Sequence, residues 1–470
     1  MTKLDRGNQR SHVLYCGLEA IPKADNVTVL RCDDSPPDFQ VPNLYPSQHA
    51  DRSEQIRHAL ERLHREHRFD RIEFGTLGGL GFRTIQAKRA GLAFGDVSLT
   101  VRLDGCGPWQ RQQAGRWPNG YEEVAVDFAE RFSFENADSP ISTSPELLDF
   151  VRSLGWVSRD AEALRSGARS PLVTIGIAHY NLGRYLPETL ASLAAQTYPN
   201  LEVLVIDDGS TDPIAIRIFS EMETLYPPYR FLRQENAGIG ATRNCCLSLA
   251  QGEYFIPVDA DNIARPEMVA RFVEAIERNP DLDALTCYFL AFEDGIGNPP
   301  KQFLHAYRPT GGPHVLASIR NVYGDANAIF RTASFRAIGG YETDRGTSCE
   351  DWEAFVKMVH AGQRIGVVPE HLFYYRHLAA GFSRRTDQMA NHRRVLRQFT
   401  QLVGLPPGEG EVLWTALIGS HQRLQQLESE RTLLRYRIAD AVFAPFARMP
   451  WVTRVVKKLM GARRASKERL

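Results

Sequence analysis

The sequence predicts an α/β protein with a largely parallel central sheet, and two observations carry this prediction. Between Pro171 and about Arg385, buried apolar runs of strand length alternate with amphipathic stretches of helix length. Such alternation is typical of parallel sheets covered by helices. The composition agrees with a globular chain, because 43% of the residues are hydrophobic and 24% are charged.

Three regions are expected, because 470 residues are too many for one hydrophobic core. Residues 1–160 alternate strand-like and helix-like segments and predict a first α/β domain. Residues 165–170, Arg-Ser-Gly-Ala-Arg-Ser, have the composition of a linker. Residues 171–385 then form the central α/β domain, and residues 386–470 are expected to be a helical extension.

The central domain is expected to begin with three buried strands. Apolar and β-branched residues run together at 173–178, 201–206 and 252–258. A helix is expected at 186–194, where leucines recur at i, i+4 and i+7, and a second helix at 241–250 leads into the third strand. Ligands of such sheets bind outside the carboxyl ends of the strands.

Polar side chains follow each of these strands. Tyr180 follows the first, Asp207 and Asp208 follow the second, and Asp259 and Asp261 follow the third. Clustered carboxylates repel one another unless one keeps a proton or a cation is supplied. Mg²⁺ is usually held by one or two carboxylates plus phosphate oxygens and waters. The last pair therefore suits a divalent cation that carries a diphosphate.

The spacing Asp-x-Asp occurs a second time, at Asp281 and Asp283. This pair lies between a helix that begins near Pro266 and a following strand, so it should lie at the opposite edge of the sheet. We expect a solvated turn with no metal role there. Position, and not spacing, distinguishes Asp259 and Asp261.

Four short motifs follow one another along the central domain. They are Val-Ile-Asp-Asp-Gly-Ser-Thr-Asp at 205–212, Glu-Asn-Ala-Gly at 235–238, Gly-Gly-Tyr-Glu at 339–342 and Glu-Asp-Trp at 350–352. Together they resemble a family 2 glycosyltransferase of the GT-A fold. The resemblance implies a GT-A, Rossmann-like mixed sheet with flanking helices.

The resemblance also implies roles on the donor side. Asp208, beside Asp207, would meet the uracil or ribose of a UDP-sugar. Tyr180 would stack near the base, with the backbone of Ala178 close by. Arg243 would either face the nucleotide or pack the loop.

A bound Mn²⁺ or Mg²⁺ ion is a further implication of the resemblance. Asp261 would be the main ligand, and Asp259 would act directly or through water beside the donor. His377 would either complete the metal shell or be a solvated loop histidine. Guanidinium groups suit phosphate, and three arginines close to this histidine are candidates for it: Arg376, Arg384 and Arg385.

The Glu-Asp-Trp motif opens a predicted helix. Carboxylates in a first helical turn can simply complement the helix dipole. By resemblance, Asp351 would instead be the general base for an acceptor hydroxyl, and Glu350 an acceptor-side or structural carboxylate. Trp352 would stack on an acceptor sugar or lie in the core.

The outer regions are less specific. Residues 71–109, with the glycine-rich segment 78–82, are similar to the N-terminal, Rossmann-like half of GT-B glycosyltransferases, which implies that residues 1–160 form a domain of this kind. The glycine-rich loop would bind an acceptor, a partner or nothing. The segment 451–469 is basic and amphipathic, and either lies on an anionic membrane surface or is a solvated tail.

Composition and patterning also set expectations for location and partners. The formal net charge is zero, which gives no reason to expect a nucleic acid partner. The seven cysteines show no CxxC spacing, as expected for reduced thiols. Neither a membrane span nor a signal peptide is expected, so the protein is predicted to be cytoplasmic, with peripheral contact at the inner face of the cell membrane through the basic tail.

The expected function is a metal-dependent inverting glycosyltransferase. It would move a sugar from a nucleotide-sugar, a UDP-sugar, to a hydroxyl of a glycan, lipid-linked or protein acceptor, as in polysaccharide biosynthesis. Two alternatives remain from the sequence: a non-catalytic sugar-binding or scaffold protein that keeps the fold, and a nucleotidyltransferase.

Overall fold

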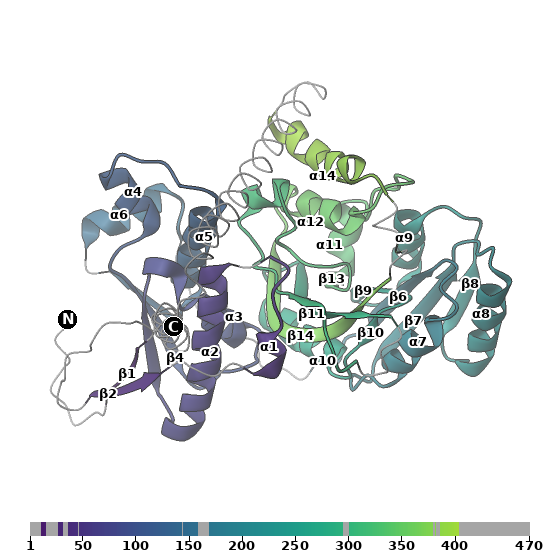
Figure 1. Ribbon diagram of the computed structural model, residues 1–470, viewed down its shortest axis with the longest axis horizontal. Coiled ribbons are helices and arrows are strands. Elements are labelled where there is room, and N and C mark those ends of the chain that lie inside the picture. Colours follow the sequence, from purple (N-terminus) through teal and green to yellow (C-terminus); the bar gives the residue numbers. More distant parts are fainter. Residues whose placement is uncertain are drawn as a thin grey trace, which may run out of the picture. The chain divides into compact units, whose positions relative to one another are not determined.

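The computed structural model describes residues 11–15, 27–31, 36–45, 47–142, 144–157, 169–294, 300–378, 381 and 386–403. The chain divides into two compact units, Met1–Cys32 with Leu405–Leu470, and Asp33–Gly404. In the first unit, β1 (Ser11–Tyr15) pairs in parallel with β2 (Val27–Arg31). The basic segment 451–469 and the arginines Arg384 and Arg385 lie outside the described residues. The second unit contains all the other elements described below (Figure 1).

The second unit is built around a nine-stranded mixed sheet with the order β10-β14-β11-β13-β9-β6-β7-β8, and β12 pairs with β11. The four strands that come first along the chain lie together at one side of the sheet, in the order β9-β6-β7-β8, and all run parallel. They are β6 (Val173–His179), β7 (Leu201–Asp207), β8 (Arg230–Arg233) and β9 (Tyr254–Asp259). The others are β10 (Ile263–Ala264), β11 (Ala284–Glu293), β12 (His305–Tyr307), β13 (Ile329–Arg331) and β14 (Ile365–His377). The prediction of an α/β fold is confirmed. The sheet is mixed rather than largely parallel, because β13 runs antiparallel to both β9 and β11, and β10 and β12 pair in the antiparallel sense as well.

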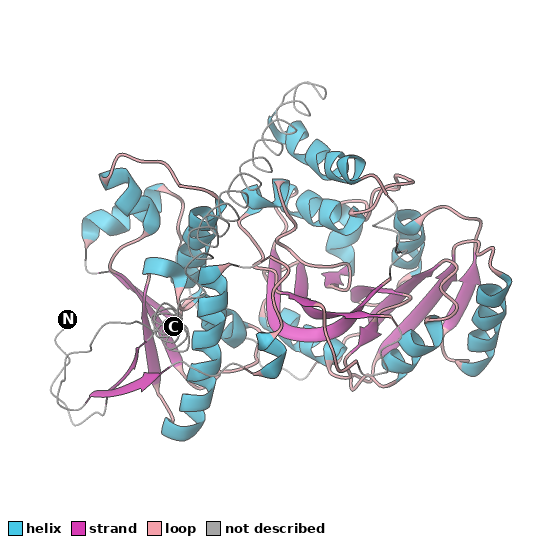
Figure 2. Cartoon of the chain, viewed as in Figure 1, coloured by secondary structure: helices cyan, strands magenta, loops and turns pink. Residues whose placement is uncertain are grey.

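Helices cover this sheet, as Figure 2 shows in cyan against the magenta strands. They are α7 (Leu186–Ala194), α8 (Pro213–Leu225), α9 (Ile239–Leu249), α10 (Met268–Arg278), α11 (Thr332–Ala337), α12 (Glu350–His360) and α14 (Gln388–Val403), with a short 3-10 helix, η2 (His314–Ser318). In α10 the apolar residues recur with helical spacing, and Met268, Phe272 and Ile276 are fully buried against the sheet.

Residues 36–157, the N-terminal region, contain a three-stranded parallel sheet. Its strands are β3 (Arg71–Gly75), β4 (Ser98–Leu103) and β5 (Ser139–Ser142). Its helices are α1 (Pro37–Gln40), α2 (Gln48–His67), α3 (Phe82–Arg89), α4 (Gly107–Gln113), α5 (Tyr121–Asn136) and α6 (Pro145–Ser153), with the 3-10 turn η1 (Leu77–Gly79). This region is therefore α/β with a small sheet, and the expectation that residues 1–160 form a separate domain stays a prediction.

The glycine-rich loop of this region already has an anionic partner. The buried carboxylate of Glu130 accepts hydrogen bonds from the backbone N–H of Gly78 at 2.7 Å and of Gly107 at 2.8 Å. Burial raises the pKa of Glu130 to about 7, although both N–H groups oppose the shift. Backbone N–H groups of this kind can cradle phosphate, but here a side chain of the same region uses them. The contacts favour a structural role for the loop.

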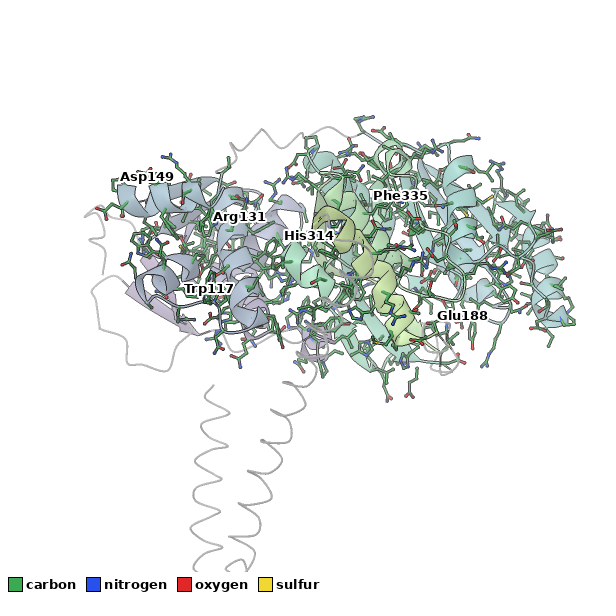
Figure 3. All side chains as sticks on the ribbon, turned by 90° about the horizontal axis from the view of Figure 1, so that it is seen from above. Trp117, Arg131, Asp149, Glu188, His314 and Phe335 are labelled. Carbon is green, nitrogen blue, oxygen red and sulfur yellow. The ribbon has the colours of Figure 1, made fainter. Side chains whose placement is uncertain are left out.

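Buried polar contacts fix the N-terminal region against the nine-stranded sheet and its helices, which we call the central region (described residues 169–403). Arg83 is almost fully buried and donates to the carbonyl oxygens of Pro309 at 3.0 Å and Arg308 at 3.3 Å. Tyr288 donates to Glu54 at 3.0 Å. Figure 3 shows the two regions together, with Trp117, Arg131 and Asp149 on the first and His314, Phe335 and Glu188 on the second.

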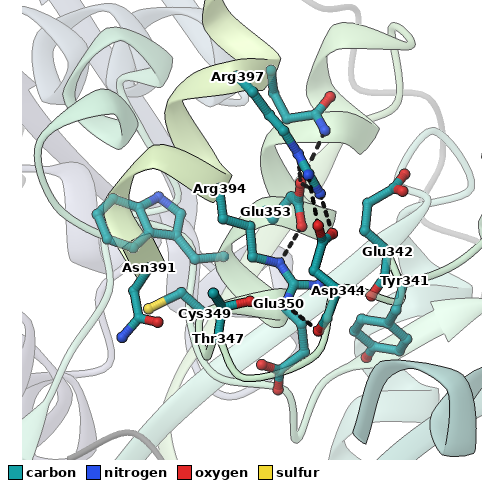
Figure 4. A network of polar contacts seen from close by, with 12 residues as sticks. Tyr341, Glu342, Asp344, Thr347, Cys349, Glu350, Glu353, Asn391, Arg394 and Arg397 are labelled. Atoms are coloured by element: carbon teal, nitrogen blue, oxygen red, sulfur yellow. Dashed lines mark hydrogen bonds and ion pairs between the residues drawn. The ribbon is translucent and has the colours of Figure 1, made fainter. Parts of the chain in front are cut away.

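The helix α14 belongs to the expected C-terminal helical extension but is bound to α12 by charged side chains. Glu353 of α12 is fully buried and accepts from Arg394 at 2.5 Å and from Arg397 at 2.8 Å. Arg397 also pairs with Asp344 (Figure 4). Since α12 begins with Glu350 and Asp351, this network fixes the helix that presents both acidic residues.

Replacing Arg394 with Leu should destabilise the protein strongly. Removal of one partner from a buried ion pair typically costs about 3–5 kcal/mol, and a loss near the lower end is expected because Arg397 still contacts Glu353. Urea unfolding of the variant should show this loss. The matched control is Arg393→Leu, one residue away and exposed, for which a change within about 0.5 kcal/mol is expected. Equal losses in both variants would contradict the role of the Glu353–Arg394 pair.

Candidate active site

The predicted polar loops meet at one edge of the sheet. In the register of the parallel strands, Ala178 lies opposite both Ile206 and Asp259, and His179 lies opposite Asp207. The residues that follow β6, β7 and β9 therefore emerge side by side, as expected.

The second Asp-x-Asp pair lies at the other edge of the sheet, before β11. Asp283 there accepts hydrogen bonds from the backbone N–H of Arg364 at 2.9 Å and from Ser334 at 2.7 Å, and Asp281 pairs with the Arg364 side chain. The predicted position of this pair is confirmed. Its carboxylates stabilise the turn through these contacts.

The loop after β6 is clamped to the loop after β7. Asn181 adopts a left-handed conformation with φ of 52°, and its side-chain oxygen accepts from the backbone N–H of Thr211 at 2.8 Å and Asp212 at 2.9 Å. The preceding Tyr180 keeps 44% of its surface exposed. Its ring is thus accessible to a planar ligand at this edge.

Asp207 is bound inside the protein. Its carboxylate contacts His179 Nδ1 at 2.8 Å and accepts from the Ser210 hydroxyl at 2.5 Å and the Ser210 N–H at 3.1 Å. Burial alone would raise the pKa of Asp207, but these hydrogen bonds outweigh it and lower the pKa. The structure places Asp207 beneath the loop, where it holds the turn that follows β7.

Asp208 organises the loop that leads into α9. One carboxylate oxygen accepts from Gln234 and from the Ala237 N–H, both at 2.8 Å, and the other accepts from the Gly238 N–H at 2.9 Å and from Asn236 at 3.2 Å. The side chain is buried. Asp208 therefore shapes this edge through four donors, and its contact with a nucleotide stays a prediction.

Arg243 of α9 bridges two of the predicted carboxylates. Its side chain is 3% exposed, and it contacts Asp259 Oδ1 and Glu350 Oε1, each at 2.5 Å. Its guanidinium also lies over the ring of Tyr341, 5.4 Å from the centroid. Of the two expected roles, the structure favours internal packing. Arg243 connects the end of β9 with the start of α12.

Three half-buried carboxylates of this centre hold their protons more tightly than usual. Partial burial, and then the charge of Asp259, raise the pKa of Asp261 to about 7. The same two causes raise the pKa of Asp325 to about 6. Burial, followed by the charges of Glu350 and Asp325, raises the pKa of Asp351 well above its ordinary value. These mutual effects show that the carboxylates form one electrostatic cluster.

The side chains at the end of β9 suit a divalent cation supplied with its phosphate ligands. Among the described residues, no group of three or more His, Cys, Asp and Glu side chains is arranged to hold a metal ion. Two carboxylates are nevertheless what Mg²⁺ commonly takes from a protein beside substrate phosphates. Burial, and then the charge of Asp259, raise the pKa of Asp261, and a bound cation would oppose both effects. The donor set of Asp259 and Asp261 therefore fits Mg²⁺ or Mn²⁺.

The end of β14 packs on the Asp261 loop. Arg376 donates to the carbonyl oxygen of Asp261 at 3.0 Å, and its backbone N–H donates to Asn262 Oδ1 at 3.1 Å. Its guanidinium also pairs with Glu188, so the structure places it in the protein framework. The ring of His377 lies edge-on to His305, with centroids 6.3 Å apart. A metal-ligand role for His377 stays a prediction.

The acceptor-side residues begin α12. Cys349 precedes them in a left-handed conformation with φ of 70°. Glu350 points to Arg243, whereas Asp351 Oδ1 accepts from the Trp352 N–H at 2.7 Å. The indole of Trp352 donates to the carbonyl of Ala317 at 2.8 Å and is 8% exposed. Of its two expected roles, Trp352 takes the one in the core.

Comparison with known proteins identifies the domain that carries these residues. A sequence profile described as Glycosyl transferase family 2 matches residues 174–339. This segment is a family 2 glycosyltransferase domain. The match includes the loops after β6, β7 and β9, whereas Glu350 and Asp351 lie beyond its end at residue 339.

The alignments with individual relatives cover only part of each relative's length. The chain is 34% identical to an uncharacterized glycosyltransferase of Haemophilus influenzae over 119 residues, which are 25% of this chain and 36% of the relative. It is 36% identical to chondroitin synthase of Escherichia coli over 114 residues, 24% of this chain and 16% of the relative. The chain thus spans well under two thirds of both relatives.

The structural likeness is weaker. The crystal structure of S. aureus TarS 1–349 in complex with UDP-GlcNAc shares 22% identity, with a TM-score of 0.40 over 51% of this chain and 69% of that chain. None of these comparisons supports the expected likeness of residues 1–160 to half of a GT-B enzyme. In the structure, the N–H groups of Gly78 and Gly107 are bound by Glu130 of the same region.

Asp325 is the main residue of the family 2 domain that sequence reasoning missed. It lies in the turn before β13 and accepts from the Asn327 N–H at 3.0 Å. The preceding Gly324 has φ of +150°, and a Cβ there would lie 2.5 Å from Thr286. An acidic residue after such a constrained glycine, before an apolar strand, was the available signal. The charge of Asp325 also reaches Tyr375, whose pKa burial and the clustered aspartates raise.

The described residues include no helix with the length and apolar character needed to cross a membrane.

Replacing Asp261 with Asn should stabilise the metal-free protein at high pH. A folded-state pKa of about 7 lies above the unfolded value, so folded Asp261 binds its proton more tightly and stability falls as pH rises from about 4 to 7. Thermal melting with a chelator should show the variant more stable than wild type at pH 8 and similar at pH 4.

The control for this measurement is Asp281→Asn, at the opposite sheet edge, where the carboxylate pairs with Arg364. No stabilisation at pH 8 is expected for it. A loss of stability at pH 8 in Asp261→Asn would contradict the clustered-carboxylate description.

Proposed function

We propose that this protein is a metal-dependent inverting glycosyltransferase. It moves a sugar from a nucleotide-sugar, a UDP-sugar, to a hydroxyl group of a glycan, lipid-linked or protein acceptor. The observation that carries the proposal is the bridge made by Arg243, because it joins Asp259 at the end of β9, inside the family 2 match, to Glu350 at the start of α12, beyond the end of that match.

The donor side is the edge formed by the loops after β6 and β7. Tyr180 offers an exposed ring for stacking on a uracil. Asp207 and Asp208 hold the two neighbouring loops in place through their buried hydrogen bonds. The backbone of Ala178 lies between Ile206 and Asp259 in the sheet, so a nucleotide seated here lies next to the carboxylates of β9.

Asp261 and Asp259 would hold the Mn²⁺ or Mg²⁺ ion, with Asp261 as the direct ligand. Such an ion, when bound, neutralises the charge of a diphosphate leaving group. Arg243 restricts Asp259 because it contacts one of its carboxylate oxygens. The other oxygen lies 3.3 Å from the side chain of Asn262.

Asp351 is the proposed general base. Inversion requires a base on the acceptor side that removes the proton of the attacking hydroxyl. Glu350 is held by Arg243 and therefore positions the start of α12. Asp351 lies next to it without a guanidinium contact of this kind among the described residues, and its raised pKa favours uptake of a proton.

Single replacement of Asp261 or Asp351 by Asn should abolish sugar transfer while the protein remains folded. Loss of a general base typically costs about 10²–10⁴ in rate. The measurement is release of nucleoside diphosphate from a panel of nucleotide-sugars with Mn²⁺, with Asp281→Asn as the control that keeps full activity. Full turnover by both variants would overturn the mechanism. Release of inorganic diphosphate would instead indicate a nucleotidyltransferase.

The pH dependence of kcat/KM should change when Asp325, the neighbour of the proposed base Asp351, is replaced. Asp351 acts in its ionised form, so kcat/KM should rise with pH through its pKa, which burial, the charge of Glu350 and then the charge of Asp325 raise. Replacing Asp325 with Asn removes that charge, and the rise should move to lower pH. The pH profile of nucleotide-sugar turnover, compared between wild type and Asp325→Asn, measures this. An unchanged midpoint or a shift to higher pH would show that Asp351 is not the titrating base.

A further inference from the structure

The N-terminal region reaches the sheet of the central region through a short extended segment that ends at Tyr45. The backbone N–H of Leu44 in this segment donates to the carbonyl oxygen of Ala306 in β12 at 2.7 Å. The ring of Tyr45 then lies edge-on to the ring of Tyr307, also in β12, with centroids 5.9 Å apart. The N-terminal region therefore supplies an aromatic side chain to this edge of the central region.

Two electrostatic effects place Tyr45 close to the start of α12. Burial, and then Cys349, the residue before α12, raise the pKa of Tyr45. Burial, and then Tyr45 and Asp351, raise the pKa of Tyr307. Interactions between charged groups weaken with distance, so Tyr45 and the proposed base both lie near Tyr307. Tyr45 keeps 38% of its surface exposed, and a ligand on the acceptor side can therefore reach it.

A guanidinium group lies against Tyr45 and a second tyrosine of the N-terminal region. Arg320, between η2 and β13, has its Cζ 5.8 Å from the ring centroid of Tyr45 and 4.9 Å from that of Tyr121 at the start of α5. Both distances are within the roughly 6 Å over which a cation is attracted to an aromatic ring. We call these three side chains the Arg320 cluster. The two rings restrict the orientation of the guanidinium.

The positive charge of Arg320 is not paired. Among the residues that the structure describes, its guanidinium contacts the two tyrosine rings but no carboxylate and no hydrogen-bond acceptor. By contrast, Arg243 and Arg394 each pair with a buried glutamate of α12. Arg320 is half-buried, and its nitrogen atoms are not among the enclosed polar atoms of the described residues. Its N–H donors therefore remain open to a ligand.

We infer that the Arg320 cluster binds an anionic group, a phosphate or a carboxylate, carried by the acceptor whose hydroxyl group Asp351 activates. The inference rests on the proposed function, because it names the acceptor class of the same site. A guanidinium matches both oxyanions with two parallel hydrogen bonds. The carboxylates of Asp351 and Asp325 would repel such an acceptor, and Arg320 supplies the opposing charge beside them. A neutral acceptor would leave this charge unpaired.

The test compares anionic probes with their neutral counterparts in ligand-observed NMR titrations of the full chain with saturating UDP and Mg²⁺. Methyl glucuronide against methyl glucoside tests a carboxylate, and glycerol 3-phosphate against glycerol tests a phosphate. At least one anionic probe should bind about tenfold more tightly than its counterpart, the typical strength of a hydrogen bond to a charged group. Arg320→Met should remove most of this preference and leave the binding of the neutral probes unchanged. The pair that shows the preference identifies the anionic group.

A second variant keeps the test decisive if Arg320→Met does not fold. Tyr45→Leu removes one ring of the cluster at an exposed position, and it should also lower the preference for the anionic probe. The control is Arg65→Met, at an exposed position of α2, which should keep the preference of the wild type.

Two results would overturn the inference: no preference for either anionic probe in the wild type, or a preference that persists in both cluster variants. Binding is measured without turnover, so the proposed function is tested separately by release of UDP from nucleotide-sugars. A chain that shows the Arg320-dependent preference but turns over no nucleotide-sugar would support the anion site and overturn the proposed function.

Discussion

The arrangement of the proposed active site depends on one buried cation. Arg243 contacts Asp259 at the end of β9 and Glu350 at the start of α12, and it is almost completely shielded from water. A buried charge without partners is costly, so each carboxylate needs the arginine and the arginine needs both. The donor side and the acceptor side are thereby fixed relative to each other by one side chain. Glu353 fixes the far side of α12 in the same way, through Arg394.

The electrostatics of the cluster follow from this arrangement. Arg243 compensates Asp259 and Glu350, while Asp261, Asp325 and Asp351 keep raised pKa values because neighbouring negative charge adds to burial. Such a cluster lowers the folding stability of the ligand-free protein but supplies groups that can bind a cation and accept a proton. Lower stability in exchange for activity is common at active sites. An excess of negative charge at the end of β9 suits a cation, and a raised pKa at Asp351 suits a base.

The strands and loops that could be predicted from the sequence are those marked by patterns of neighbouring residues. The strands β6, β7 and β9 and the polar residues behind them could be recognised because apolar runs and acidic loops are adjacent in the chain. Arg243 and Glu350 are 107 residues apart, so their contact left no local pattern. Asp325 follows a glycine and precedes an apolar strand, which is a weak local signal, but its place in the carboxylate cluster depends on turns that are distant in the chain. Glu130 lies 52 residues from Gly78, so the sequence could not reveal that a side chain occupies the glycine-rich loop. The expected likeness of this region to the N-terminal half of a GT-B enzyme finds no support in the comparisons.

The most direct test of the Arg243 bridge is a double-mutant cycle on Mn²⁺ affinity, measured by electron paramagnetic resonance. Glu350→Gln changes the acceptor side only, but it leaves the charge of Arg243 compensated by Asp259 alone, so Mn²⁺ should bind at least threefold more weakly. In an Arg243→Met background the same substitution should have a much smaller effect, because the bridge is gone. Equal effects of Glu350→Gln in both backgrounds would show that the two sides are independent and would contradict the account.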